Sequence, residues 1–354
     1  MNETARQTRP SQADPTSPPQ ARVWVLDDPR AGTAAQAIGI AERLGVPFRR
    51  IPLAWNWMAT MAGLVPRGSL IGLSAPTRRL MAEGGAEAAL LDRGPALVIS
   101  SGRRSAAVAL WLKANTGARI VHCVAPGVLS PGLGGLLRQD LFDLLVIPTH
   151  DRPPLAPNVF PVLGVPHRLS PLMLRQANAA WSERLSHLPH PRVVLLAGGP
   201  VGGSDIPPAL AHALGRRVGR LAAARNGAVL ASTSRRTGAE ATEALAAGLA
   251  PALNLLYRWG EPGDNPYSGY LATADAVVVT ADSVSMISEA CATRAPVYVA
   301  LPELAGPRQR RLLAALLDAG QVRRLGDDVS PWPRPALDEA GRVAEEIRHR
   351  FPLD

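Results

Sequence analysis

The densest group of residues suited to ligand chemistry lies in residues 280–290, where an apolar run leads into a loop rich in hydroxyl side chains. Either Asp282 or Ser283 can cap a helix that starts there. The first amides of that helix, in residues 283–285, would point outward and could bind an anion. Glu289 lies about two turns further on, where its carboxylate could accept hydrogen bonds from both hydroxyls of a ribose. The alternative is an ordinary capped helix with one surface acid.

A glycine-rich stretch, residues 198–204, follows another apolar run and precedes a helical pattern. Gly198 and Gly199 would let backbone amides approach a phosphate at the start of that helix. No Gly-Lys-Ser/Thr closes the stretch, so it is not a Walker A loop, and its spacing differs from the dinucleotide fingerprint. The competing interpretation is a tight turn.

Two further loops are expected at the same edge of a parallel sheet. In residues 233–237, Ser234, Arg235 and Arg236 offer a hydroxyl and two guanidinium groups to a pyrophosphate. In residues 261–267, Asn265 could help to frame a base or a sugar. A solvated turn and an ordinary loop are the respective alternatives. Because ligands bind outside the carboxyl ends of parallel strands, the four loops together predict a site for a nucleotide diphosphate.

Candidates for proton transfer lie in the first half of the chain. Asp27 and Asp28 follow the first apolar run, where either could act as the general base for an acceptor hydroxyl. His150, beside Asp151, is the third candidate. Capping acids and an ordinary turn pair are the alternatives. No serine-hydrolase or zinc-protease motif occurs and no Asp-x-Asp pair is placed to hold a nucleotide's metal ion, so we expect no metal site and no cofactor besides the donor substrate.

These loops need a scaffold in which short buried strands alternate with helices. In the first half, the expected strands are residues 23–26, 96–100, 119–124, 142–147 and 159–163, and the expected helices are residues 33–44 and 105–115. A helix capped by Ser170 is then expected to run from Pro171 to about residue 188. In the second half, the expected strands are residues 192–197, 228–232, 252–257, 276–280 and 297–301, and the expected helices are residues 207–225, 238–248, 266–273, 283–293 and 307–319. Continuous apolar runs are typical of parallel strands covered on both faces.

The predicted fold class is therefore α/β, with two Rossmann-like domains facing a cleft. At 354 residues, the chain suits two domains of about 150 residues each. The expected division is a disordered tail (1–20), an acceptor domain (21–168), a linker with a helix (169–190), a nucleotide-sugar domain (191–330), and a last linker and helix (331–354) that could cross back onto the first domain.

The formal net charge is +9, and Lys113 is the only lysine, so the surplus is almost all arginine. Such a surplus indicates compositional drift, or attraction to phosphates on a nucleotide or an anionic membrane surface. Nucleic acid is not expected as a partner, because no basic helix or basic-aromatic stripe occurs. Cys123 and Cys291 are expected to be free and buried. Without a secretory signal or a spanning segment, the expected location is the cytoplasm, with peripheral contact at the inner face of the membrane as an option.

Two resemblances emerge from these motifs. The glycine-rich loop, with residues 274–279 and 283–289, resembles the donor domain of GT-B glycosyltransferases, which implies that Ser283 and Ser285 hold the diphosphate and Glu289 the ribose. Residues 22–325 resemble the mitochondrial fission "elongated mitochondria" family, whose many bacterial members are regarded as glycosyltransferases and whose plant members are adaptors that bring a dynamin-related protein to mitochondria. The likeness is carried by residues 101–104, 149–151, 157–159, 198–200, 233–237, 261–267 and 280–293.

These observations predict a metal-independent glycosyltransferase. The C-terminal domain would bind a nucleotide-diphosphate sugar, and the N-terminal domain would bind a saccharide or lipid acceptor of the cell envelope. One departure concerns the base: many GT-B enzymes place a histidine after the first-loop glycine, whereas Thr33 follows Gly32 here. Two alternatives stay open, a sugar-nucleotide 2-epimerase with the same architecture and a non-catalytic adaptor on the same fold.

Overall fold

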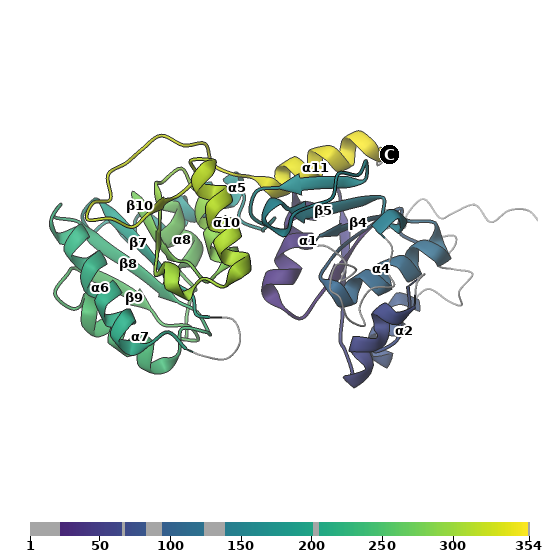
Figure 1. The fold of residues 1–354 in the computed structure, drawn as a ribbon, viewed down its shortest axis with the longest axis horizontal. Coiled ribbons are helices and arrows are strands. Elements are labelled where there is room, and N and C mark those ends of the chain that lie inside the picture. The colour runs from purple at the N-terminus through teal and green to yellow at the C-terminus, as the bar shows by residue number, and fades with distance from the viewer. Residues whose placement is uncertain (1–21, 66–67, 83–93, 124–138, 201–204, 353–354) are drawn as a thin grey trace, which may run out of the picture.

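The computed structural model describes residues 22–65, 68–82, 94–123, 139–200 and 205–352. The chain forms two α/β domains that lie side by side, each built on a six-stranded parallel sheet (Figure 1). The predicted fold class, α/β with two Rossmann-like domains, is confirmed.

The N-terminal sheet has the strand order β2-β1-β3-β4-β5-β6. Its strands are β1 (Val23–Asp27), β2 (Phe48–Pro52), β3 (Leu97–Ser101), β4 (Arg119–Cys123), β5 (Leu144–Pro148) and β6 (Val159–Val162). Its helices are α1 (Ala31–Leu44), α2 (Ala75–Ala82) and α4 (Arg103–Thr116), with short 3-10 helices η1 (Trp57–Leu64), η2 (Gln139–Leu141) and η3 (Thr149–Asp151). Gly45 and Gly117 end α1 and α4 in the left-handed conformation, as a glycine C-cap does.

The C-terminal sheet has the order β12-β11-β10-β7-β8-β9. Its strands are β7 (Arg192–Ala197), β8 (Ala228–Thr233), β9 (Asn254–Tyr257), β10 (Ala276–Thr280), β11 (Val297–Ala300) and β12 (Arg323–Arg324). The helices around it are α6 (Pro208–Ala223), α7 (Ala239–Leu249), α8 (Tyr267–Ala272), α9 (Val284–Cys291), the 3-10 helix η4 (Pro302–Leu304) and α10 (Pro307–Asp318). Along β10, Val277 and Val279 pack into one core and Val278 into the other, which explains the continuous apolar run.

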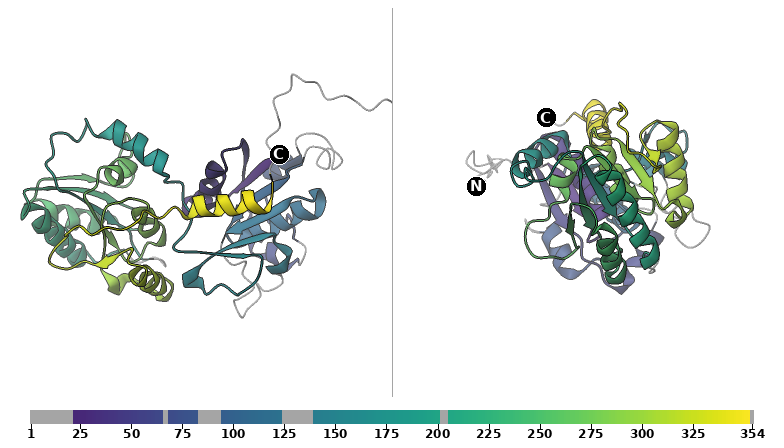
Figure 2. Two further views of the ribbon diagram at one scale, coloured as in Figure 1. Left: turned by 90° about the horizontal axis from the view of Figure 1, so that it is seen from above. Right: turned by 90° about the vertical axis from the view of Figure 1, so that its left-hand side faces the viewer.

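The chain crosses between the domains twice. After β6 it enters α5 (Pro171–Trp181), which Ser170 caps as predicted; the helix ends at Trp181, not near residue 188, and turns follow. The last helix, α11 (Glu339–Arg350), returns to the N-terminal domain and packs against α1 (Figures 1 and 2). Val343 and Ile347 of α11 share a core with Ile38 and Ile40 of α1. The expected crossing back is confirmed.

Arg43 fastens the two crossings to each other. Its guanidinium donates to both carboxylate oxygens of Asp338, at 3.1 and 3.3 Å, and Asp338 caps α11. The same guanidinium donates to the carbonyls of Arg168 (3.1 Å) and Leu169 (2.9 Å) in the first crossing. One side chain of the N-terminal domain therefore holds both connections in place.

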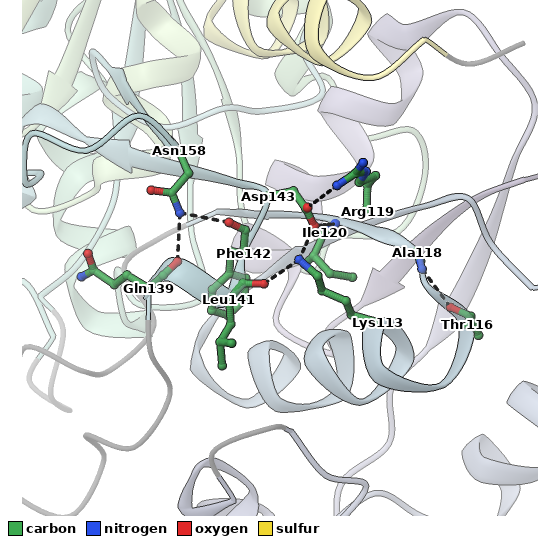
Figure 3. A network of polar contacts seen from close by, with 10 residues as sticks. All are labelled: Lys113, Thr116, Ala118, Arg119, Ile120, Gln139, Leu141, Phe142, Asp143 and Asn158. Atoms are coloured by element: carbon green, nitrogen blue, oxygen red, sulfur yellow. Dashed lines mark hydrogen bonds and ion pairs between the residues drawn. The ribbon is translucent and has the colours of Figure 1, made fainter.

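A polar network at the amino ends of β4 and β5 includes Lys113, the single lysine of the chain (Figure 3). The carboxylate of Asp143 accepts from Lys113 Nζ (2.7 Å), the amide of Ile120 (2.8 Å) and Arg119 Nη1 (3.0 Å). Partial burial acts to raise the pKa of Asp143, but these donors together outweigh it and hold the pKa below its usual value. Asn158 donates to two carbonyls on the same side of the sheet, those of Gln139 and Phe142. The network is structural, because ligands are expected at the opposite, carboxyl ends of the strands.

Both cysteines are free and buried, as predicted. Burial raises the thiol pKa of Cys123 and of Cys291 to about 12, so neither is present as a reactive thiolate near neutral pH. None of the helices in the described ranges combines the length and the apolar character needed to cross a bilayer.

Candidate functional site

Three loops of the C-terminal domain meet where the sheet order reverses. β7 lies between β8 and β10. The chain continues from β7 to β8 and β9 on one side, and then crosses back to form β10 and β11 on the other side. Ala197 at the end of β7 pairs with Thr233, and Val279 near the end of β10 pairs with Leu196, so the loops that follow start at one edge. This is the topological switch point, where open parallel sheets bind ligands.

The two predicted glycines let these loops pack together closely. The amide of Gly198 donates to Thr280 Oγ1 (2.8 Å), and that of Gly199 donates to Asp282 Oδ2 (2.6 Å). A Cβ on Gly199 would lie 1.8 Å from the carbonyl oxygen of Arg236, and one on Gly198 would lie 2.3 Å from Asp282 Oδ2. Both amides therefore have protein acceptors, and close approach requires glycine at both positions. Residues 201–204 of the same stretch lie outside the described residues.

The loop after β8 is held by its hydroxyl groups. Ser234 Oγ donates to the carbonyl of Gly198 (3.0 Å) and accepts from the amide of Arg236 (3.2 Å). Thr237 Oγ1 donates to the same Gly198 carbonyl (2.6 Å). Arg235 is exposed and Arg236 half-buried, so their positive charges lie on the turn itself.

Asp282 and Ser283 play separate roles at the start of α9. Ser283 is the N-cap, and its Oγ accepts from the amide of Met286 (3.4 Å). Asp282 is buried with 1% exposure; its Oδ2 binds Gly199, whereas its Oδ1 has no hydrogen-bond partner. The amides of Val284 and Ser285, in the first turn, have no carbonyl within the helix to bond with. The carboxylate of Asp282 therefore organises the loop, and the first turn of α9 carries the remaining donors.

Ser285 brings this helix up against the N-terminal domain. Its Oγ lies 3.3 Å from the position that a Cβ on Gly32 would occupy, at the start of α1. Three residues further along α9, Ser288 Oγ accepts from the amide of Val165 in the first crossing (3.1 Å). The amino ends of α1 and α9 thus meet at the domain boundary, and both carry partial positive charge.

Glu289 is the most perturbed acid at this site. Its Oε2 accepts from the hydroxyl of Tyr267 (2.5 Å), at the start of α8. Burial raises the pKa of Glu289 to about 7, although the Tyr267 hydrogen bond opposes the shift. The same burial raises the pKa of Tyr267 well above its usual value. Asn265 is exposed, and its Oδ1 accepts from the amide of Tyr267 (3.0 Å), so it positions the start of α8.

On the N-terminal side, the two predicted acids already have cationic or amide partners. Asp27 Oδ2 lies 2.5 Å from Arg50 Nη2 on the neighbouring strand. Asp28 is 5% exposed; its Oδ1 accepts from the amide of Arg30 (3.0 Å), and its Oδ2 lies 3.8 Å from Arg104 Nη2. Arg104 also lies over the ring of Trp55, 5.1 Å from its centre. Asp28 therefore sits between the amino ends of α1 and α4.

His150 lies in η3 at a contact between the domains. Asp151 accepts from Arg308 of α10 through both oxygens, at 2.8 and 2.7 Å, and Arg311 Nε donates to the carbonyl of His150 (2.7 Å). The His150 ring is buried, and neither ring nitrogen has a hydrogen-bond partner. Burial lowers its pKa to about 4, and the charges of Arg308 and Arg311 act in the same direction against the opposing effect of Asp151. At neutral pH this imidazole is uncharged.

Two residues that sequence reasoning did not assign to the site are Tyr267 and Arg308. The sequence places Tyr267 where the 261–267 loop runs into the expected helix 266–273 and gives it no role of its own, and its contact with Glu289 joins segments 22 residues apart. Arg308 meets Asp151 across 157 residues of chain, and no local pattern signals such a pair. Across the described ranges, no three His, Cys, Asp or Glu side chains gather closely enough to hold a metal ion.

Two cavities beside α5, both lined by described residues, lie away from the candidate site. One, of about 500 Å³, is bordered by Leu174 and Thr293, and the other, of about 690 Å³, by Ser182 and Asp275. Asp275 precedes β10 and Thr293 follows α9, so both cavities are at the edge opposite the three loops. The candidate residues do not line them.

Comparison with known proteins places these features in context. The model of the family described as mitochondrial fission ELM1 matches residues 31–351. The mitochondrial fission protein ELM1 of Arabidopsis thaliana is 30% identical over 291 residues, covering 73% of this chain and 64% of that protein. The chain thus spans less than two thirds of the length of that plant relative. An uncharacterised protein of Rickettsia prowazekii is 22% identical over 94% of this chain and 99% of its own length.

Among solved structures, the UDP-GlcNAc 2-epimerase of Methanocaldococcus jannaschii has a similar fold, with a TM-score of 0.52 at 14% identity. The match covers 92% of this chain and 99% of the epimerase, so it includes both domains. The family model spans nearly all of the described structure, including the loops after β7, β8 and β10 and helix α11. The chain therefore belongs to the mitochondrial fission ELM1 family.

Proposed function

We propose that this protein is a metal-independent glycosyltransferase that transfers a sugar from a nucleotide-diphosphate donor to an acceptor hydroxyl. The observation that carries the proposal is that the β7, β8 and β10 loops meet one another and that α9, which follows the last of them, meets the start of α1 at the domain boundary. Ser285 of α9 and Gly32 of α1 are in contact range there, so a ligand on the first turn of α9 would face the other domain.

The donor's diphosphate would bind at the first turn of α9. The amides of Val284 and Ser285 and the hydroxyls of Ser283 and Ser285 are the donors available there, and the partial charge of the helix end favours an anion. Arg235 and Arg236 would supply the positive charge that stabilises the diphosphate as it leaves, when negative charge develops on it. Gly198 and Gly199 would contribute by packing, because their amides already have acceptors within the protein.

The ribose would bind Glu289. A carboxylate can accept from two neighbouring hydroxyls at once, and the Tyr267 hydroxyl would hold it in place. Because the pKa of Glu289 is raised to about 7, part of the population is protonated at neutral pH in the free protein. Two ribose hydroxyls would favour the ionised form, so donor binding would release protons.

The acceptor would bind the N-terminal domain, and we propose Asp28 as the base that activates its hydroxyl. Asp28 lies at the carboxyl end of β1, four residues before Gly32, and its Oδ2 has only a distant contact with Arg104. Asp27 is turned to Arg50, and the low pKa of His150 makes it a weak base. The acceptor class we propose is a saccharide or lipid of the cell envelope.

A second candidate is a non-catalytic adaptor that binds a nucleotide or a protein. The observation in its favour is that Asp27 and Asp28 both have partners and that His150 is buried. The third candidate is a sugar-nucleotide 2-epimerase. The observation in its favour is that the UDP-GlcNAc 2-epimerase of Methanocaldococcus jannaschii has a similar fold.

A panel of nucleotides distinguishes these candidates. Melting temperature would be measured with UDP, GDP, CMP and their sugars, for the native chain and for Glu289→Ala. Stabilisation by one nucleotide that Glu289→Ala abolishes supports a nucleotide-sugar enzyme, and no response to any member contradicts it. With the responding sugar nucleotide, release of nucleoside diphosphate only when an acceptor is present indicates transfer. Interconversion without an acceptor indicates epimerisation, and neither reaction indicates the adaptor.

A further inference from the structure

The segment between β2 and α2 combines exposed apolar side chains with a one-sided charge. Trp57 is 84% exposed and Met61 is 42% exposed, and both belong to η1. Residues 43–82 contain no aspartate or glutamate; two of their arginines are engaged elsewhere, because Arg43 holds the domain crossings and Arg50 pairs with Asp27. The exposed Arg78 and Arg79 lie in α2, directly after this loop. We infer that this surface, which we call the η1–α2 face, binds the headgroup region of a bilayer that contains anionic lipids.

The η1–α2 face is a packed part of the domain. The amide of Asn56 donates to the carbonyl of Gly72 (2.8 Å), and Ser74 donates to Ala54 (2.8 Å), so η1 and the start of α2 are joined. A Cβ on Gly72 would lie 2.4 Å from the backbone of Ala59, which shows how closely the two segments approach. η1 also packs against α4. Trp57 and Met61 are therefore held outward by a fixed backbone, and folding buries neither.

The chemistry favours a bilayer over a soluble acidic partner. A tryptophan side chain is amphipathic and is enriched where headgroups meet hydrocarbon, and nearby arginines are attracted to anionic lipids. The other large apolar side chains that the described residues expose occur singly on separate segments, namely Leu155, Leu172, Leu253 and Trp259. On the η1–α2 face, two such side chains lie in a stretch without acidic residues that continues into the exposed Arg78 and Arg79.

The position of the η1–α2 face is compatible with the candidate site. η1 follows the carboxyl end of β2, and Asp27 and Asp28 follow the carboxyl end of its neighbour β1, so both belong to the same edge of the sheet. In Figure 1, α2 lies at the lower edge of the N-terminal domain, below α4, and the C-terminal domain lies to the left. Docking there would leave the C-terminal loops in solution, where a water-soluble donor could reach them. The inference does not depend on the proposed reaction, because lipid binding needs no nucleotide.

Flotation of the full-length protein with vesicles tests the inference. Vesicles of phosphatidylcholine alone would be compared with vesicles that also contain phosphatidylglycerol. We expect binding only to the anionic vesicles, falling as salt is raised, because salt screens the arginines. The variant Trp57→Ala/Met61→Ala should lower the partition coefficient about tenfold, since both side chains leave the interface. Arg79→Glu should lower it by a similar factor on anionic vesicles.

Trp259→Ala is the matched control, because Trp259 is also an exposed tryptophan (58%) but lies on the C-terminal domain. It should bind vesicles as the native chain does, and unchanged melting temperatures would show that all variants fold. The inference is overturned if the native chain does not bind anionic vesicles, or if Trp57→Ala/Met61→Ala binds these vesicles as well as Trp259→Ala does. Glu289→Ala should keep full vesicle binding, so a failed nucleotide assay and a failed lipid assay are separate results.

Discussion

The hydroxyl of Tyr267 donates a 2.5 Å hydrogen bond to Oε2 of Glu289, and this contact joins the start of α8 to the middle of α9. It connects the turn after β9 with the helix whose first turn meets the N-terminal domain. The pair therefore couples the carboxylate proposed for the ribose to the loops around it, and its protonation is open to measurement.

Nucleotide affinity should rise with pH through neutrality. The pKa of Glu289 is raised to about 7, so the carboxylate that accepts ribose hydroxyls is mostly protonated at pH 6 and mostly ionised at pH 8. We expect affinity to increase by up to about tenfold over that interval. Titration calorimetry at several pH values measures the change, and Glu289→Gln should flatten it. In Tyr267→Phe the midpoint should move to higher pH, because a bond that favours the ionised form is lost. A profile that Glu289→Gln leaves intact would assign the dependence to another group.

The unfolding free energy should depend on pH through the same carboxyl group, that of Glu289. A pKa raised from 4.5 to about 7 favours the folded state below pH 4.5, and this advantage is lost as pH rises toward 7. Glu289→Gln removes the effect, so the difference in unfolding free energy between native chain and variant should change by about 3 kcal/mol between pH 4.5 and pH 8. Urea unfolding of both proteins at each pH gives this difference and cancels the titration of other groups. A pH-independent difference contradicts the prediction.

Gly199 should tolerate no side chain. In Gly199→Ala the new Cβ would lie 1.8 Å from the carbonyl oxygen of Arg236, so the β7 and β8 loops must separate. We expect a loss of roughly 1–3 kcal/mol in unfolding free energy, together with weaker nucleotide binding. Gly326→Ala is the control, because no atom lies within 4 Å of the added Cβ. Equal stability of the two variants would mean that the loops do not pack as described.

Asp151 and Arg308 should be energetically coupled across the domain boundary. Arg308 binds both oxygens of Asp151, and Asp151 is only 16% exposed, so the pair is better shielded than a typical surface pair. A double-mutant cycle with Asp151→Asn and Arg308→Gln should give a coupling energy of about 1 kcal/mol. The Arg217–Asp327 pair is the comparison, since the Asp327 side chain is fully exposed and its coupling should be close to zero. Indistinguishable couplings would remove Asp151–Arg308 as a link between the domains.

Features set by neighbouring residues could be predicted from the sequence. The left-handed glycines at Gly45 and Gly117, the caps at Ser170 and Ser283, and the strand at residues 276–280 all have local causes. Features set by distant segments could not. β2 was missed because its two arginines, Arg49 and Arg50, interrupt the apolar pattern at an edge of the sheet, and β12 is only two residues long.

The candidate site shows the same division. Residue types predicted that the loops after β7, β8 and β10 lie together, because parallel strands place their carboxyl ends at one edge. They could not predict that the Gly198 and Gly199 amides bind Thr280 and Asp282, since those partners come from a strand some eighty residues away. The assignments of Asp27, Asp28 and His150 to proton transfer stay predictions. The structure adds the partners of these three side chains, and our proposal of Asp28 as the base rests on them.

The return of α11 to the N-terminal domain has a consequence for biosynthesis. Val343 and Ile347 complete the core around α1, yet they are translated after the whole C-terminal domain. The N-terminal domain is therefore the first to emerge from the ribosome, but it cannot complete its core until the C-terminal domain has been made and α11 follows it. Until α11 is made, the part of α1 that it covers stays exposed, and a nascent chain would present that apolar surface to chaperones.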